Sequence, residues 1–123
     1  GTNYSYETTI RASASGTFTS LSAWKFYTDG GNGLGTGVGL SVKAIAQGSY
    51  AQATGTQGQT ASAMSGGSDA FGYSSGSPLS LTGSISSAGV GSVQYVRAQA
   101  SVASTAALGT SSSEMLTVQW DES

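Results

Sequence analysis

Apolar and polar residues alternate along several segments of this chain with a period of two, not with the 3.6-residue period of a helix. The clearest segment is residues 38–46, where every even position is Val, Leu or Ala while Ser41 and Lys43 take the opposite face. Strict alternation is typical of a strand with one face buried and one face in water. This segment therefore predicts a half-buried β-strand.

Three further segments carry the same signal. Residues 23–28 place Trp24 and Phe26 on one face, and residues 114–120 alternate with Leu116, Val118 and Trp120 as the inward set. Residues 93–102 fit a strand if a β-bulge near Tyr95 and Val96 shifts which positions face inwards. Its inward residues are then Val96, Ala98, Ala100 and Val102, and its outward residues Gln94, Arg97, Gln99 and Ser101. Shorter candidate strands are residues 6–12, 48–53, 60–64, 70–73 and 79–85.

Between these segments lie stretches of Gly, Ser, Thr, Asn and Asp, so turn-forming residues recur at short intervals with no helical stripe between them. This spacing is typical of all-β sandwiches and barrels. We expect residues 1–123 to form one domain, an all-β antiparallel sandwich of roughly seven to nine strands, Ig-like or jelly-roll, with no helix longer than a turn. The predicted core comprises Trp24, Phe26, Val38, Leu40, Val42, Leu116, Val118 and Trp120.

The composition makes that core thin. Gly, Ser, Thr and Ala occupy 73 of the 123 positions, and Leu, Ile, Val and Phe together number only 20. There is no cysteine, so no disulfide compensates for the small core. We therefore expect contacts between subunits to supply the missing apolar burial, in a homo-oligomer.

The residue inventory also excludes several classes of function. Without His or Cys, the chain has no imidazole base, thiol nucleophile or cysteine-based zinc site. Four basic residues and a net charge of −2 do not form the basic stripe that nucleic acids or anionic lipids require. No apolar run is long enough to span a membrane and no signal peptide is seen, although a start at Gly1 is consistent with a removed initiator Met or leader. We expect no catalysis, no nucleic-acid partner and no membrane partner.

The loop from Asp29 to Gly37 is the most conspicuous local feature, because five of its nine residues are glycine. A phosphate cradle needs a helix directly after the loop, whereas a strand follows here. Asp29 and Asn32 offer two side-chain oxygens, fewer than a calcium loop normally presents. We expect an ordinary connecting loop with neither a metal ion nor another cofactor, and calcium is the alternative.

Two other groups of residues are candidates for a site. Glu114, Asp121 and Glu122 lie near the C-terminus, but the adjacent pair points to opposite faces of an extended chain, so we interpret all three as solvated charges and not as a glycosidase pair. The tyrosines are candidates for outer faces or interfaces, where a ring with one polar end is favoured. They are Tyr4, Tyr6, Tyr27, Tyr50, Tyr73 and Tyr95.

About half of the chain resembles small β-sandwich virion structural proteins of tailed bacteriophages, of the decoration type. The resemblance lies in WKFYTDG at residues 24–30 leading into LGTGV at 34–38, in VASTA at 102–106 followed by GT at 109–110 and EMLTVQWDE at 114–122, and more weakly in GSPLSLTG at 76–83. None of these stretches is a catalytic motif, so the resemblance transfers no site residues.

The resemblance implies a virion structural protein, most often one that decorates a capsid or forms part of the tail. We expect it to bind a preformed surface, the major capsid protein or another virion surface, and to stabilise that surface mechanically on the particle's exterior. A trimer is the oligomer that it implies. The low charge and the abundance of Ala, Ser and Gly suit a self-assembling, pilin-like surface filament as well. A secreted carbohydrate-binding module with exposed tyrosines is the third alternative.

Overall fold

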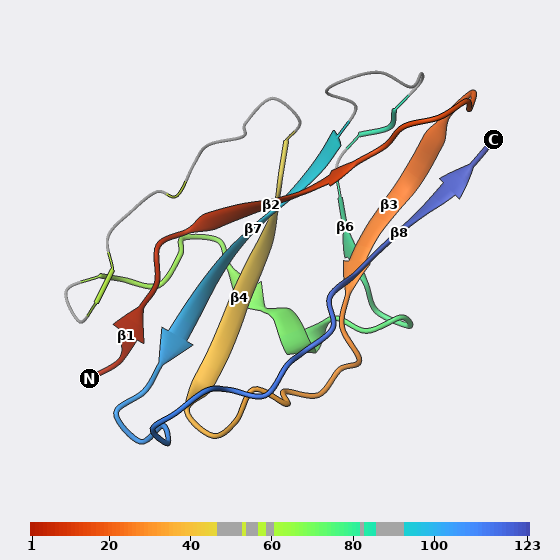
Figure 1. Ribbon diagram of the computed structural model, residues 1–123. Coiled ribbons are helices and arrows are strands. Elements are labelled where there is room, and N and C mark those ends of the chain that lie inside the picture. The colour runs from red at the N-terminus through yellow and green to blue at the C-terminus, as the bar shows by residue number, and fades with distance from the viewer. Residues whose placement is uncertain (47–52, 54–56, 59–60, 82, 86–92) are drawn as a thin grey trace.

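In the computed structural model, which describes residues 1–46, 53, 57–58, 61–81, 83–85 and 93–123, two antiparallel sheets pack face to face (Figure 1). The all-β sandwich is therefore confirmed. The first sheet has the order β1-β7-β4-β5, with β2 also paired to β7, and the second has the order β6-β3-β8. The strands are β1 Asn3–Tyr4, β2 Thr8–Ser13, β3 Leu21–Tyr27, β4 Val38–Ile45, β5 Ser68–Asp69, β6 Leu79–Ser80, β7 Val93–Val102 and β8 Thr117–Glu122.

The segment with the clearest alternation, residues 38–46, forms a strand as predicted. The strand β4 pairs with β7 over its whole length, from Val38 opposite Val102 to Ile45 opposite Tyr95. Residues directly opposite each other share a face, so the even positions of β4 and β7 point towards the second sheet. Val42 is completely buried at the centre of this face.

The bulge expected near Tyr95 and Val96 is wrong, because β7 pairs with both β2 and β4 without any shift of register. Both faces of β7 are covered, so no polar alternation is required of it. Gln94 and Gln99, predicted to be outside, are 1% and 4% exposed.

Gln99 shows how the outer face of the first sheet is covered. Its amide nitrogen donates to the carbonyl oxygens of Ser5 and Ser62, and its side-chain oxygen accepts the N–H of Met64 at 2.7 Å. The side chain thus holds residues 62–64 against the outer face of β7, and it satisfies its own polar atoms in doing so.

A bulge does occur, in β3. The register between β3 and β8 shifts between Ser22 and Lys25, and Ala23 has a φ of 50°. This shift turns both Leu21 and Trp24, three residues apart, into the interior, where they are 3% and 2% exposed. Strict alternation alone would have put them on opposite faces.

Residues 70–73, expected as a strand, instead contain the 3-10 helix η1 (Ala70–Gly72). The Asp69 carboxylate accepts the N–H of Phe71, and the N–H of Tyr73 donates to the carbonyl oxygen of Ala70. Such side-chain caps compete with strand pairing. The turn buries Ala70 and Phe71.

The remaining strand predictions are correct in part. Strands occur in three of the predicted segments, with bounds Thr8–Ser13, Thr117–Glu122 and Leu79–Ser80. In the segment 79–85, Ile85 adds a single bridge to Leu21. Residues 61–64 form no strand, and residues 48–53 lie, apart from 53, outside the described residues.

The core lies between β4 and β7 of one sheet and β3 and β6 of the other. Its buried members, in addition to partly buried neighbours such as Leu40 and Val118, are Leu21, Trp24, Phe26, Val42, Ala70, Leu81, Ile85, Val96 and Ala98. The predictions of Trp24, Phe26 and Val42 as core are confirmed, and Val38 is half-buried. The prediction that Leu116 and Trp120 are buried is wrong, because both side chains are exposed on one side of the sandwich.

Candidate functional site

One long side of the sandwich lies between two strands that each have a single partner. Among the described residues, β2 pairs only with β7, and β8 pairs only with β3. Within the described part of the chain each strand therefore ends its sheet, and no strand pairs with its outer edge. Such edges are places where another chain can add.

Large apolar residues stand on this side. By the phase of their strands they belong to the inward faces, Ile10 opposite Val96 and Val102 opposite Val38, with Leu116 and Trp120 in phase with Val118. Nevertheless they remain well exposed. The exposed fractions are 37% for Ile10, 42% for Val102, 36% for Leu116 and 44% for Trp120. We call these four residues the open side.

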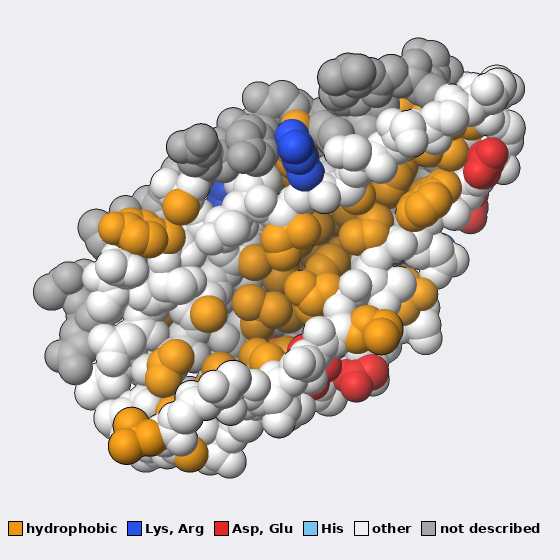
Figure 2. Space-filling view, in the orientation of Figure 1, with side chains coloured by type: hydrophobic (Ala, Val, Ile, Leu, Met, Phe, Trp, Pro, Cys, Tyr) orange, Lys and Arg blue, Asp and Glu red, His pale blue; other side chains and the backbone are white. Residues whose placement is uncertain are grey.

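Figure 2 shows apolar side chains gathered in a band between the two sheets on the face towards the viewer, with β8 along its right-hand border. Within the described residues no strand lies beyond β8 to cover this band. This is why Leu116 and Trp120 are exposed although their alternation is that of core residues. The pattern identifies the inward face but not whether a neighbour covers it.

Two tryptophans, Trp24 and Trp120, lie together at one end of the open side. Trp24 is buried and its indole N–H donates to the carbonyl oxygen of Leu21 at 3.1 Å. Trp120 stacks on Trp24 with ring centroids 5.1 Å apart and an angle of 29° between the ring planes. One face of Trp120 is thus packed, and the remainder of the ring contributes apolar surface to the open side.

A hollow of about 250 Å³ adjoins this stack. Its lining includes the apolar side chains of Phe18, Leu21 and Trp24, and Glu122 is its ionisable group. Ala12 from β2 and Trp120 from β8 also line it. The hollow therefore joins the two strand edges at one end of the sandwich.

The charges near the open side differ between its two strands. Arg11 lies on β2 and is exposed, whereas Asp121 and Glu122 lie at the end of β8 and are exposed. The strand β2 thus carries one cation, with Glu7 directly before the strand, and the end of β8 carries two carboxylates. The interpretation of Asp121 and Glu122 as surface charges agrees with their exposure.

The loop from Asp29 to Gly37 uses its polar side chains to hold its own backbone. The Asp29 carboxylate accepts the N–H of Gly31 at 2.9 Å, and Asn32 accepts the N–H of Leu34 at 2.9 Å while donating to the carbonyl oxygen of Val38. Sequence reasoning missed a third member, Glu114, whose carboxylate accepts the N–H of Gly33. These bonds are those of a structured turn.

The structure does not assemble the acidic residues into a site. Glu114 is bound to the loop beyond the start of β8, while Asp121 and Glu122 lie at the end of that strand. In the described part of the chain no three residues among His, Cys, Asp and Glu come together as metal ligands would. The described residues include no helix long and apolar enough to cross a membrane.

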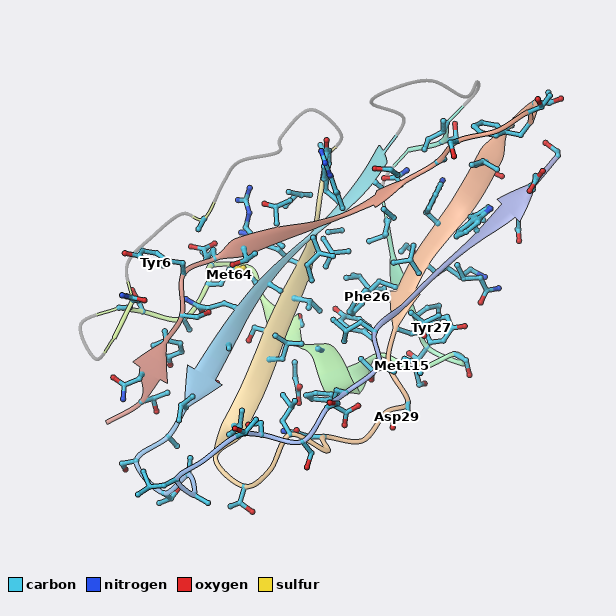
Figure 3. All side chains as sticks on the ribbon, in the orientation of Figure 1. Tyr6, Phe26, Tyr27, Asp29, Met64 and Met115 are labelled. Carbon is cyan, nitrogen blue, oxygen red and sulfur yellow. The ribbon has the colours of Figure 1, made fainter. Side chains whose placement is uncertain are left out.

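A second hollow of about 250 Å³ lies where β3 ends and β8 begins. Figure 3 shows Tyr27, Met115 and Asp29 close together there. The Tyr27 hydroxyl donates to the side-chain oxygen of Gln119 at 2.9 Å, and Ser74 and other small polar residues complete the lining. An aromatic ring beside hydroxyl and carboxylate groups is a possible support for a polar ligand.

The other tyrosines divide by environment. Tyr6 is 41% exposed, as expected of a tyrosine on an outer face, whereas Tyr95 has the predicted outward orientation but is only 9% exposed. Tyr95 lies on the outer face of the first sheet, which the chain itself covers. Tyr4, Tyr27 and Tyr73 are half-buried, and Tyr50 lies outside the described residues.

Comparison of the chain with models of protein families, with curated proteins and with solved structures finds no match.

Proposed function

We propose that this chain is a non-catalytic structural subunit of a virion surface, a capsid decoration protein of a tailed bacteriophage that acts as a homo-oligomer. The observation that carries the structural role is the open side: four large apolar residues, in phase with the core, remain at least 36% exposed between two free strand edges. Large exposed apolar patches mark interaction sites. The virion context comes from the sequence resemblance.

The surface chemistry supports attachment by packing. With four basic and six acidic residues in 123, many copies can crowd together with little mutual repulsion. Few ion pairs are available to such a surface, so its attachment should depend weakly on salt. Small side chains also permit the close approach of neighbouring backbones.

The direct test is co-sedimentation of the purified chain with particles of the phage that encodes it, prepared without this chain. We expect binding that changes little between low and high salt. Ile10→Ser, which makes the open side polar, should weaken binding roughly tenfold. Leu108→Ser is the matched control, because Leu108 is fully exposed in the loop after β7 and does not line the hollow beside Trp120, so its replacement should leave binding unchanged.

A well-folded chain that does not associate with these particles at either salt concentration contradicts the proposal. Imaging of native particles would then distinguish a tail position from a filament. A pilin-like filament is the runner-up, because free strand edges on the same side also suit strand-mediated polymerisation.

The hollow beside Tyr27 supports a second candidate, a carbohydrate-binding module. Sugars stack on aromatic rings and bond to hydroxyl and carboxylate groups, and Tyr27, Ser74 and Asp29 offer these groups around one hollow. A glycan array with clear hits that are lost in Tyr27→Ala and kept in Tyr6→Ala would favour this candidate. An array without hits would contradict it.

A further inference from the structure

The strands β2 and β8, which carry the two free edges, end near each other. Ala12 and Ser13 at the end of β2 line the same hollow as Trp120 and Glu122 at the end of β8. Both strands also run towards the same end of the sandwich (Figure 1). Positions near the end of β2 therefore lie level with positions near the end of β8.

The charged residues on these edges point outwards from the core. Arg11 is opposite Tyr95, on the outer face of the first sheet, and Asp121 is opposite Ser22, one residue away from the inward pair of Leu21 and Glu122. Each is one to two residues from the end of its strand. Arg11 and Asp121 thus lie near the same end of the sandwich, on opposite sheets and with opposite charge.

We propose that the open side is covered by a second copy of this chain, with β2 of one copy beside β8 of the next and Arg11 facing Asp121 of the neighbour. The inference rests on the proposed function of a self-associating subunit and specifies its contact. A twofold axis parallel to the strands produces this arrangement. It keeps the direction of every strand and the height of each residue along the strands, and it places the first sheet of one copy beside the second sheet of the other.

Charge selects this arrangement over the alternative twofold. Rotation about an axis perpendicular to the sheets would place β2 beside β2 and β8 beside β8 in antiparallel order, so that Arg11 would lie beside a strand without an acidic residue and the carboxylates of β8 beside a strand without a cation. Like charges at an interface oppose association, whereas opposite charges favour it and fix the register. In the proposed contact Ile10 and Trp120 are shielded from water in every copy.

The experiment is a charge exchange followed by sedimentation equilibrium of the purified full chain at low salt. Arg11→Asp alone sets two carboxylates against each other at each contact, and Asp121→Arg alone sets two cations there. We expect each variant to associate about tenfold or more weakly than the native chain. The double variant Arg11→Asp/Asp121→Arg should regain native association.

Mixing the two single variants adds a sharper test. A variant with a carboxylate at position 11 and one with a cation at position 121 complement each other at both contacts of a two-copy ring, so the mixture should associate like the native chain. A three-copy ring always retains one repulsive contact, so there the mixture should recover only in part. Either recovery supports the proposed contact and gives the number of copies.

The control is Lys25→Asp, which changes the net charge as Arg11→Asp does but lies on the central strand β3. It should associate normally, and the melting curve of each variant should show that the fold is intact. A native chain that stays monomeric, or an oligomer that is insensitive to both single variants, overturns the inference. If the oligomer is insensitive to both single variants but particle binding is undiminished, the proposed function still holds. Charge-dependent association without particle binding refutes only that function.

Discussion

On one side of the sandwich, η1 and the residues Leu81 and Ile85 contribute buried side chains to the core, whereas on the other side no described segment covers the four residues of the open side. On the closed side Ala70, Phe71, Leu81 and Ile85 are at most 7% exposed. The four residues of the open side are at least 36% exposed. The same apolar patterning thus yields core on one side and surface on the other.

The difference lies in what the chain itself places at each edge. The closed side has η1, fixed by Thr28, whose hydroxyl donates to the carbonyl oxygen of Tyr73 at 2.9 Å and accepts the N–H of Gly30. Leu81 and Ile85 continue the edge of β3 through backbone bonds with Trp24 and Leu21. No described segment does this for β8. A buried side therefore serves stability, and an uncovered one is available for association.

Two isoleucines provide the largest expected contrast. Ile85→Ala removes a side chain that is 5% exposed in the core cluster, and we expect the free energy of unfolding to fall by about 2–4 kcal/mol. Ile10→Ala makes the same change at a residue that is 37% exposed, with an expected loss of about 0.5–1 kcal/mol in the monomer. Urea unfolding of both variants at low protein concentration measures the difference. Equal losses would show that the two sides do not differ in burial.

The second-largest effect is expected from the hydrogen bonds of Thr28 on the closed side. Thr28→Val keeps the shape of the side chain but removes its hydroxyl, leaving the N–H of Gly30 and the carbonyl oxygen of Tyr73 without this partner. We expect a loss of about 1–2 kcal/mol in the free energy of unfolding, measured by urea denaturation. Thr117→Val on β8 is the control and should change stability by less than about 0.5 kcal/mol. A neutral Thr28→Val would mean that η1 is not held by this side chain.

At Trp120 we expect a smaller effect on the monomer than at Ile85 or Thr28. Trp120→Thr removes the ring stacked on Trp24 but retains a residue suited to strands, so the monomer should lose about 1 kcal/mol. Association of the native chain should suffer more, because exposed aromatic rings dominate interface energies. Equilibrium sedimentation and urea unfolding of the same sample separate the two effects. A loss in unfolding free energy without a loss in association would assign Trp120 to the fold alone.

The sequence predicted the sandwich because alternation reports which face of a strand is inward. Val42, Trp24 and Phe26 are buried as that pattern requires. It could not predict the exposure of Leu116 and Trp120, since the inward phase of β8 is the same whether or not a neighbour covers it. The bulge in β3 and the capped turn after Asp69 were also missed, because each depends on one local conformation that has no periodic signal.

Parts of the candidate site were visible in the sequence as residues but not as an arrangement. Arg11, Asp121 and Glu122 could be recognised as charges, but only the topology places their strands on the same side. Glu114 was considered as a solvated charge, and its bond to Gly33 follows from a contact between residues 81 positions apart. Long-range contacts of this kind are set by the packing of the sheets.

The most direct test of the central claim is quenching of tryptophan fluorescence by acrylamide across a range of protein concentrations. The chain has only two tryptophans, Trp24 at 2% exposed and Trp120 at 44%, so quenching of the dilute chain reports mainly on Trp120. If a second copy covers the open side, quenching should fall and the emission should shift to shorter wavelengths as the concentration rises through the association range, and Arg11→Asp should move both changes to higher concentration. An oligomer in which Trp120 is quenched as strongly as in the dilute chain would contradict the account.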